Sequence, residues 1–140
     1  MKIIRVNKED RQLIHRFLVN AGIDTLRSFT YFDSRSLDIL DNHVVTLVLE
    51  DDDKSIIGYG HLDKEGETVW LGIALSQGHK GKGLGKVIMD ALISSASEEG
   101  VDEIKLSVYR DNVPAQRLYE KFGFKLSDQN EKSYFYTLIL

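Results

Sequence analysis

The stretch Gly78-His79-Lys80-Gly81-Lys82-Gly83-Leu84-Gly85-Lys86 stands between a strand-like run and a helix-like run. Glycines allow successive backbone N–H groups to approach a phosphate without interference from Cβ atoms. A helix N-terminus adds free N–H donors and the positive end of the helix dipole. The three lysines add positive charge to a chain whose formal net charge is -4. We therefore predict that Lys80–Lys86 forms a phosphate-cradling turn that opens a helix; the alternative is a flexible Gly-Lys turn without a ligand.

The hydrophobic pattern on both sides of this stretch predicts one α/β sheet. Before it, three runs separated by turn-like clusters predict an antiparallel meander, namely Val44–Leu49, Ser55–Leu62 and Thr68–Leu75. After it, apolar residues recur every three or four positions from Leu84 to Ser95, and Ile104–Val108 alternates like a strand. This strand-helix-strand order predicts a parallel strand neighbour reached by a right-handed crossover.

The remaining elements complete a mixed, mostly antiparallel sheet of about six to seven strands with helices on both faces. Their expected ranges are a strand over Ile3–Val6, a helix between the N-cap Asn7 and Gly22, a short helix over Ser36–Leu40, a helix from Val113 to Gly123 with Pro114 in its first turn, and strands over Phe124–Ser127 and Ser133–Leu140. The segment 24–42 otherwise has no clear periodicity.

Size and composition predict a single domain over residues 1–140. No apolar run is long enough to span a membrane, and Arg5 interrupts the apolar N-terminus, so a soluble cytoplasmic protein is expected. The chain has no cysteine and its four histidines are scattered, which argues against disulfides, a cysteine nucleophile and a metal centre. The acidic balance disfavours a general nucleic-acid binder.

Two common phosphate motifs do not fit the glycine stretch. A Walker A loop requires Lys and Ser or Thr where Leu84 and Gly85 stand. A dinucleotide fingerprint requires glycines in the pattern Gly-x-Gly-x-x-Gly at the start of a parallel βαβ unit. Here the glycines fall at 81, 83 and 85, after an antiparallel meander. A nucleotide-binding regulatory domain is therefore a disfavoured third hypothesis.

Lys80-Gly81-Lys82-Gly83-Leu84-Gly85 resembles the pyrophosphate motif of the GNAT-family, acyl-coenzyme-A-dependent N-acetyltransferases, Arg/Gln-x-x-Gly-x-Gly/Ala. Lys80 departs from the motif, because it keeps a donor but lacks the guanidinium fork or the amide. A second block, Asn112 to Phe124, resembles the later motif of the same family through its Asn, Ala, Tyr and Gly-Phe. The strand order is similar along essentially the whole chain.

The resemblance implies that acetyl-coenzyme A lies between the strands Thr68–Leu75 and Glu103–Tyr109, a central pair that splays apart in this family. Gly72 is expected to help that distortion. The cofactor-binding residues implied by the resemblance are Ile73, Ala74 and Leu75 for pantetheine, Lys80, Gly81, Lys82, Gly83, Leu84, Gly85 and Lys86 for pyrophosphate, and Asn112 for the pantetheine arm.

The resemblance also implies direct attack of an amine on the thioester. Tyr119 matches the tyrosine of the family and is the expected acid for the departing thiolate; core packing is its alternative. A backbone N–H near Ile73 or Ala74 would stabilise the oxyanion. The strand Val69–Leu75 lacks the carboxylate found in many relatives, so water, His61, Asp63 or Glu67 would serve as base. We name His61 as the catalytic candidate, against a purely structural strand histidine.

The acceptor is expected to lie against residues 26–42, which include Arg27, Phe29, Tyr31, Phe32 and Arg35. The same aromatic residues would equally cover the first helix. The expected function is transfer of an acetyl group to a primary amine of a small molecule or amino sugar, by a monomer or homodimer. A peptide or protein N-terminal acetyltransferase and a catalytically silent acyl-coenzyme-A-binding module remain alternatives.

Overall fold

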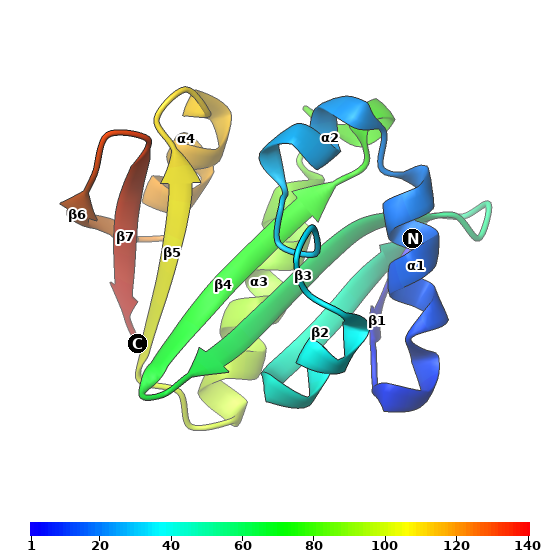
Figure 1. Ribbon diagram of the computed structural model, residues 1–140, viewed down its shortest axis with the longest axis horizontal. Helices are drawn as coiled ribbons and strands as arrows, with labels where there is room; N and C mark the ends of the chain where they lie inside the picture. The colour runs from blue at the N-terminus through cyan, green and yellow to red at the C-terminus, as the bar shows by residue number, and fades with distance from the viewer.

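The computed structural model describes residues 1–140 and is built on one seven-stranded sheet (Figure 1). The strands are β1 (Lys2–Arg5), β2 (His43–Glu50), β3 (Ile56–Glu65), β4 (Thr68–Leu75), β5 (Glu103–Tyr109), β6 (Lys125–Gln129) and β7 (Ser133–Ile139). Their spatial order is β1-β2-β3-β4-β5-β7-β6, and only β4 and β5 are parallel neighbours. The predicted mixed, mostly antiparallel sheet is confirmed.

Helices cover both faces of the sheet, as predicted (Figure 1). They are α1 (Gln12–Asn20), α2 (Ile23–Ser28), α3 (Leu84–Glu98) and α4 (Val113–Lys121). A core of 18 buried residues contains the buried hydrophobic side chains of α3 and α4. A separate core of 9 buried residues lies under α1. We call these two sides the α3 face and the α1 face. None of the helices is both long and apolar enough to cross a membrane.

Two glycines in β3 allow α3 to pack directly on the sheet. A Cβ atom added at Gly58 or Gly60 would lie 2.7 Å from a methyl group of Ile88 in α3. Such a separation is far below ordinary van der Waals contact, so any side chain here would push the helix away. On this face the backbone of β3 packs directly against the side chains of α3.

The central strands β4 and β5 meet at one place and then diverge (Figure 1). Their single bridge joins Trp70 to Lys105, whereas β5 pairs with β7 from Glu103 to Tyr109. We call the space beyond this bridge the β4–β5 gap. The expected splay is present, but Gly72 does not cause it by a bulge, because the ladder between β3 and β4 runs without a register shift.

The segment before β2 differs most from expectation. The short helix α2 had no periodic signal, and the expected helix at 36–40 is a 3₁₀ helix over Leu37–Asn42. Asn7 does act as an N-cap, since its side chain accepts from the N–H of Glu9 at 2.9 Å. It caps a 3₁₀ turn, however, and α1 begins only at Gln12.

Candidate active site

The glycine stretch forms an open turn at the N-terminus of α3. Gly81 and Gly83 have φ values of 79° and 77°, and Gly83 is the N-cap without any side-chain capping bond. The first N–H groups of a helix lack intrahelical partners. A Cβ atom added at Gly78, Gly81 or Gly83 would meet nothing within 4 Å, so the space above the turn is free. This geometry suits a phosphate group.

The side chains around this turn have separate tasks. Lys80, Lys82 and Lys86 are exposed, and no carboxylate pairs with them. Leu84 is buried in the core, so only its backbone can face a ligand. Gly85 lies close to α4, because its added Cβ would lie 3.0 Å from a methyl group of Leu118. The absence of a side chain at Gly85 therefore leaves room for Leu118 of α4 against α3.

The hydrogen-bond phase of β4 decides which backbone groups face the gap. Ser76 donates its N–H to Ile57 at 2.8 Å, and bonded pairs alternate along an antiparallel ladder. By this alternation Ala74 is bonded to Tyr59 of β3, whereas the N–H and C=O of Ile73 point away from β3. Ile73 thus offers free backbone groups to the β4–β5 gap, and Ala74 does not.

Leu75 is only partly free to bind a ligand. Its backbone points to the gap side like that of Ile73, but its carbonyl already accepts from the Thr25 hydroxyl at 2.7 Å. Asn112, at the opposite side of the gap, caps α4 by accepting from the N–H of Ala115 at 3.3 Å. The side-chain amide N–H groups of Asn112 stay available.

Tyr119 lies on α4 with its ring in the core of the α3 face. It is 6% exposed and its ring centroid lies 6.0 Å from that of Phe124. Its hydroxyl has no hydrogen-bond partner in the chain. It is nevertheless not fully buried, because Asp63 Oδ1 is the only fully buried side-chain oxygen or nitrogen without a partner. The hydroxyl therefore keeps a small accessible surface. Burial raises the pKa of Tyr119, which keeps the phenol protonated.

His61 lies on the α1 face of β3, directly over Gly72 of β4. A Cβ at Gly72 would lie 2.4 Å from Cε1 and Nε2 of the imidazole, so the glycine makes room for the ring. Burial, followed by the charges of His43 and Arg35, lowers the pKa of His61 well below its usual range. The ring is therefore neutral at pH 7.

The partner of His61 assigns its tautomer. Tyr59 Oη lies 2.7 Å from His61 Nδ1, and this buried hydroxyl has no other partner. If Nδ1 carried the proton, the hydroxyl hydrogen of Tyr59 would remain unpaired, which is costly in the interior. The network therefore places the proton on Nε2. With this tautomer His61 presents Nε2–H toward Gly72 of β4. The role of His61 as the base stays a prediction.

Tyr31, His43 and Asp63 form a second set of hydrogen bonds beside His61. Tyr31 Oη donates to Asp63 Oδ2 at 2.7 Å and accepts from His43 Nε2 at 2.8 Å. His43 Nδ1 in turn accepts from the Thr46 hydroxyl at 2.8 Å. The Tyr31 ring centroid lies 4.2 Å from that of His61. We call Tyr31, His43, Tyr59, His61 and Asp63 the His61 cluster.

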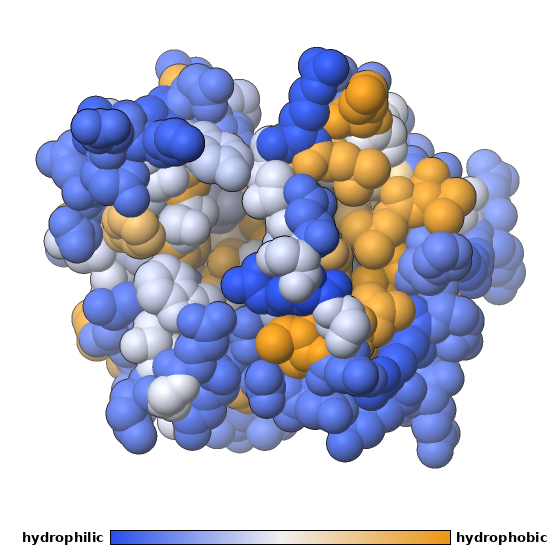
Figure 2. Space-filling view, in the orientation of Figure 1, coloured by the Kyte–Doolittle hydropathy of each residue, from blue (hydrophilic) through white to orange (hydrophobic).

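The His61 cluster gathers residues that the sequence separates widely. Asp63 pairs across the sheet with both His43 and Trp70, so the cluster lies on the α1 face beside the closed end of the gap. Figure 2 shows this face hollowed between the side of β5 to β7 and the side of α2. His43 was not identified from the sequence. Its only signal there was its position just before a strand.

The aromatic segment 27–35 divides between packing and the site. Phe29 and Phe32 contact Tyr59 with ring centroids 5.4 and 5.5 Å apart, so they cover the α1 core. Arg27 is exposed and lies 3.9 Å from Asp24. Tyr31 is part of the His61 cluster, and the Arg35 guanidinium lies 4.4 Å from the Tyr31 ring centroid. Glu67 is exposed in the turn before β4.

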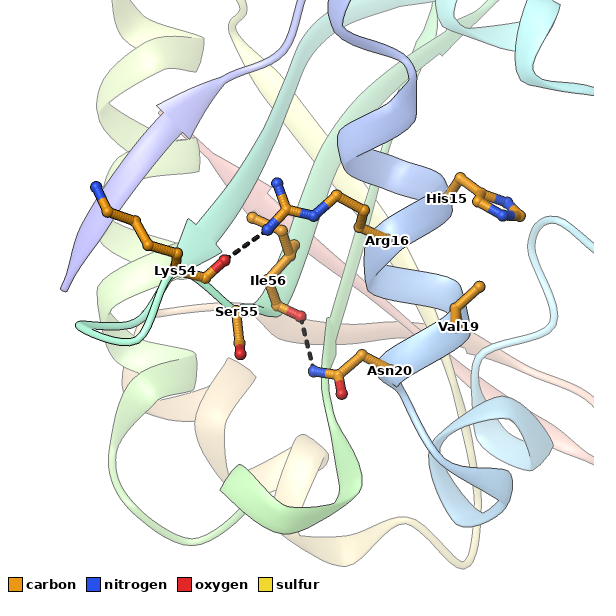
Figure 3. Close-up of a pocket in the computed structure, with 7 residues that line it drawn as sticks. All are labelled: His15, Arg16, Val19, Asn20, Lys54, Ser55 and Ile56. Carbon is orange, nitrogen blue, oxygen red and sulfur yellow. Dashed lines mark hydrogen bonds between the residues drawn. The ribbon is translucent and has the colours of Figure 1, made fainter.

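A surface hollow between α1 and the β2–β3 turn lies outside this site (Figure 3). Arg16 donates to the Lys54 carbonyl at 2.5 Å and Asn20 to the Ile56 carbonyl at 3.2 Å. His15 and Val19 point away from these bonds in Figure 3. The side chains of Arg16 and Asn20 are thus already engaged with backbone carbonyls. No group of three or more His, Asp or Glu side chains in the chain is arranged as a metal site.

Comparison with known proteins agrees with this geometry. Residues 11–124 match the model of the acetyltransferase (GNAT) family. An uncharacterised N-acetyltransferase, YycN of Bacillus subtilis, is 30% identical over 78% of this chain and 72% of its own. A spermine/spermidine N(1)-acetyltransferase of the same organism is 36% identical over 48% of this chain, and the match spans only 45% of that relative.

A solved structure shares the fold over the whole chain. A Salmonella typhimurium protein, solved with its cofactor acetyl-CoA, superposes with a TM-score of 0.77 at 21% identity and covers 100% of this chain and 94% of its own. The family match extends from α1 to the end of α4 and includes both blocks of sequence on which the resemblance rested. The chain therefore belongs to the acetyltransferase (GNAT) family.

Proposed function

We propose that the protein transfers the acetyl group of acetyl-coenzyme A to a primary amine of a small molecule, in a complex that holds both substrates. The observation that carries this proposal is the β4–β5 gap, which begins at the Trp70–Lys105 bridge and leads past the free backbone of Ile73 toward the glycine turn. Family membership and a relative named as a spermine/spermidine N-acetyltransferase support an amine acceptor.

The cofactor is assigned to this gap by matching its chemistry to the free groups. The amides of pantetheine pair with the N–H and C=O of Ile73 and with the N–H of Leu75, as an added strand would. The pyrophosphate occupies the space above Gly81 and Gly83, where helix N–H groups and lysines favour an anion. Asn112 has side-chain amide N–H groups left for the pantetheine arm.

The reaction then needs three protein groups at the closed end of the gap, namely an acid for the thiolate and two donors for the oxyanion. The neutral amine nitrogen forms a bond to the thioester carbon, the carbon–sulfur bond breaks, and the thiolate takes the Tyr119 proton. The nitrogen gives up one proton to water, and water reprotonates the Tyr119 phenolate. The Ile73 N–H and His61 Nε2–H are the donors assigned to the developing oxyanion. Burial raises the pKa of Tyr119, so the phenol still carries its proton when the thiolate departs.

The test separates cofactor choice from catalysis. Acetyl-coenzyme A, ATP and NAD are compared at equal concentration by thermal shift, since a ligand at about 100 times its Kd stabilises by about 2.7 kcal/mol. Free-thiol release is then measured with primary amines. Selective stabilisation with thiol release supports the proposal. A shift without release from any amine favours the catalytically silent binding module, and a shift with ATP or NAD alone overturns the cofactor assignment.

A further inference from the structure

Trp70 and Phe135 are two large aromatic side chains that contribute to neither core of the protein. Both are half-buried, yet neither belongs to the 18-residue core, to the 9-residue core or to the side chains packed against them. Their ring centroids lie 6.4 Å apart at an interplanar angle of 70°, an edge-to-face contact. We call this pair the aromatic platform. Part of each side chain stays at the surface, where it can contact a ligand.

The aromatic platform lies on the α1 face, at the closed end of the β4–β5 gap. Val69 and Leu71 of β4 and Tyr136 of β7 point into the 18-residue core of the α3 face. Because side chains alternate along a strand, Trp70 and Phe135 point to the opposite face. Trp70 is also the β4 residue of the single bridge to β5. The platform therefore adjoins the place where the acetyl transfer is proposed to occur.

No helix covers this part of the α1 face. In Figure 1, α1 and α2 lie on the side of β1 to β4, whereas β5 and β7 carry no helix toward the viewer. Ser107 and Tyr109 of β5 are exposed, although they alternate with the buried Leu106 and Val108. The hollow in Figure 2 lies between this side of the sheet and the side of α2. An acceptor can approach the closed end of the gap from this hollow, since the core fills the α3 face.

Lys105, the bridge partner of Trp70, places a cation beside the aromatic platform. Its ammonium lies 3.9 Å from Glu103, and its side chain is 40% exposed. A second ammonium of a polyamine over the Trp70 ring would be repelled by this charge at short range. A neutral aromatic ring meets no such repulsion, and its contact with the platform adds to the gain from burying apolar surface. The platform therefore suits an amine that has one charge and an aromatic ring.

We propose that the acceptor is an arylalkylamine, whose ring packs on Trp70 and Phe135 while its amino group reaches the thioester. The inference rests on the proposed acetyl transfer and names the class of its acceptor. Ile73, the assigned oxyanion donor, is three residues from Trp70, roughly 10 Å along the strand. A ring on the platform and a chain of two or three carbons span about this distance. The nitrogen bonds to the thioester carbon and releases a proton to water, while the carbon–sulfur bond breaks and the thiolate takes the Tyr119 proton.

A binding test without turnover is possible because Trp70 is the only tryptophan in the chain. Its fluorescence, excited selectively, reports on the platform alone. Phenethylamine is titrated into the complete chain saturated with coenzyme A, which has no acetyl group to transfer. Phenethylamine should change the tryptophan emission in a saturable way, and ethanolamine at equal concentration should not. Equal responses to the two amines, or no response to either, would overturn the proposal.

The kinetic test compares amines at saturating acetyl-coenzyme A. Phenethylamine and tryptamine should have a kcat/KM at least about tenfold above that of ethanolamine, spermidine or glucosamine. Trp70→Leu and Phe135→Leu should each lower the ratio of kcat/KM for phenethylamine to that for ethanolamine by about fivefold or more, mainly through KM for phenethylamine. Trp70→Phe, which keeps a ring, should retain most of the ratio.

Tyr134→Leu is the matched control, because Tyr134 precedes Phe135 on β7 but packs against the core of the α3 face. This variant should keep the ratio of the wild type. Stabilisation by acetyl-coenzyme A should be retained in all four variants, which shows that they fold. If only one platform variant folds, its ratio decides.

The outcomes distinguish this inference from the function on which it rests. If acetyl-coenzyme A neither stabilises the protein nor releases thiol with any amine, the acetyl transfer itself fails and the inference with it. If thiol is released but spermidine, glucosamine or ethanolamine serves as well as phenethylamine, only the arylalkylamine proposal is overturned. It is equally overturned if Trp70→Leu and Phe135→Leu slow all amines alike, since the platform would then have only a structural role.

Discussion

The two sides of the candidate active site are built from different parts of the chain. The cofactor side consists mainly of backbone: a glycine turn, a helix N-terminus and the unpaired edge of β4. The acceptor side consists of side chains, since the His61 cluster brings Tyr31 and His43 together with three residues of β3 through two sets of hydrogen bonds. The first can serve any member of a family that shares a cofactor, and the second can differ with the acceptor.

Tyr119→Phe gives the largest expected effect and tests a side chain on the cofactor side. Loss of the hydroxyl removes the proton donor for the thiolate, so kcat should fall by about 10²-fold or more. Acetyl-coenzyme A should bind almost as before, because the ring still packs on Phe124. Kinetics and thermal shift measure the two quantities separately.

The matched control is Tyr136→Phe, which removes a hydroxyl from another buried tyrosine of the same core. This variant should keep its turnover. If Tyr119→Phe also turned over normally, Tyr119 would have only a packing role, and the chemistry on the cofactor side would rest on backbone groups alone.

Gly72→Ala tests where the two sides meet. The new methyl group would lie 2.4 Å from the His61 ring, which is held by Tyr59 and contacted by Tyr31. Displacing a packed ring typically costs 1–3 kcal/mol, so we expect about 2 kcal/mol less free energy of unfolding and a lower kcat. Urea denaturation and thiol release provide the measurements.

Gly78→Ala controls for replacing a glycine as such, because its φ is ordinary and its new Cβ would meet nothing within 4 Å. Equal stability losses in the two variants would show that Gly72 is not needed to accommodate His61.

The cofactor side was largely predictable from the sequence because its determinants are consecutive. The glycine stretch, the helix after it and the splayed strands are all where they were expected. Two details of the cofactor side could be learned only from the three-dimensional structure. The backbone N–H and C=O of Ala74 point to β3, because their direction depends on the strand register. Gly85 packs on Leu118, because contacts between helices depend on the tertiary fold.

The acceptor side was less predictable because its residues meet only in three dimensions. The helix α2 is six residues long, too short for a periodic signal, and is held by contacts to β4 and the residues after it. The sequence suggested Tyr31 and Arg35 together with Phe29 and Phe32, without separating packing from binding. His43 joins them only because β2 pairs with β3.

Gly83→Ala probes the backbone character of the cofactor side. A methyl group here would enter the open space above the turn, at a φ of 77° that disfavours side chains. We expect the Kd for acetyl-coenzyme A to rise about tenfold, equivalent to about 1.4 kcal/mol. Titration calorimetry would measure it.

Gly66→Ala is the matched control, because Gly66 also has a positive φ and open space but lies in the turn between β3 and β4. It should lose similar stability and keep its affinity. Equal affinity losses would indicate a general effect of backbone strain, and the glycine turn would lose its assignment to pyrophosphate.

The acceptor side should contribute to the pH dependence of stability, because it contains histidines with lowered pKa values, whereas the cofactor side consists mainly of backbone. Burial lowers the pKa of His43 to about 4, partly opposed by Asp63, against about 6.5 in an unfolded chain. Between these values the unfolded chain binds a proton that the folded chain does not, so stability falls as the pH is lowered from about 6.5 to about 4. Because His43 is only partly buried, we expect it to account for about 1 kcal/mol of this loss of stability.

His43→Gln should flatten the fall of melting temperature in this window, while Gly83→Ala should leave the slope of melting temperature against pH unchanged. An identical slope in the wild type and His43→Gln would mean that His43 is protonated in the folded chain, which would contradict its donation from Nε2 to Tyr31 with Nδ1 as an acceptor.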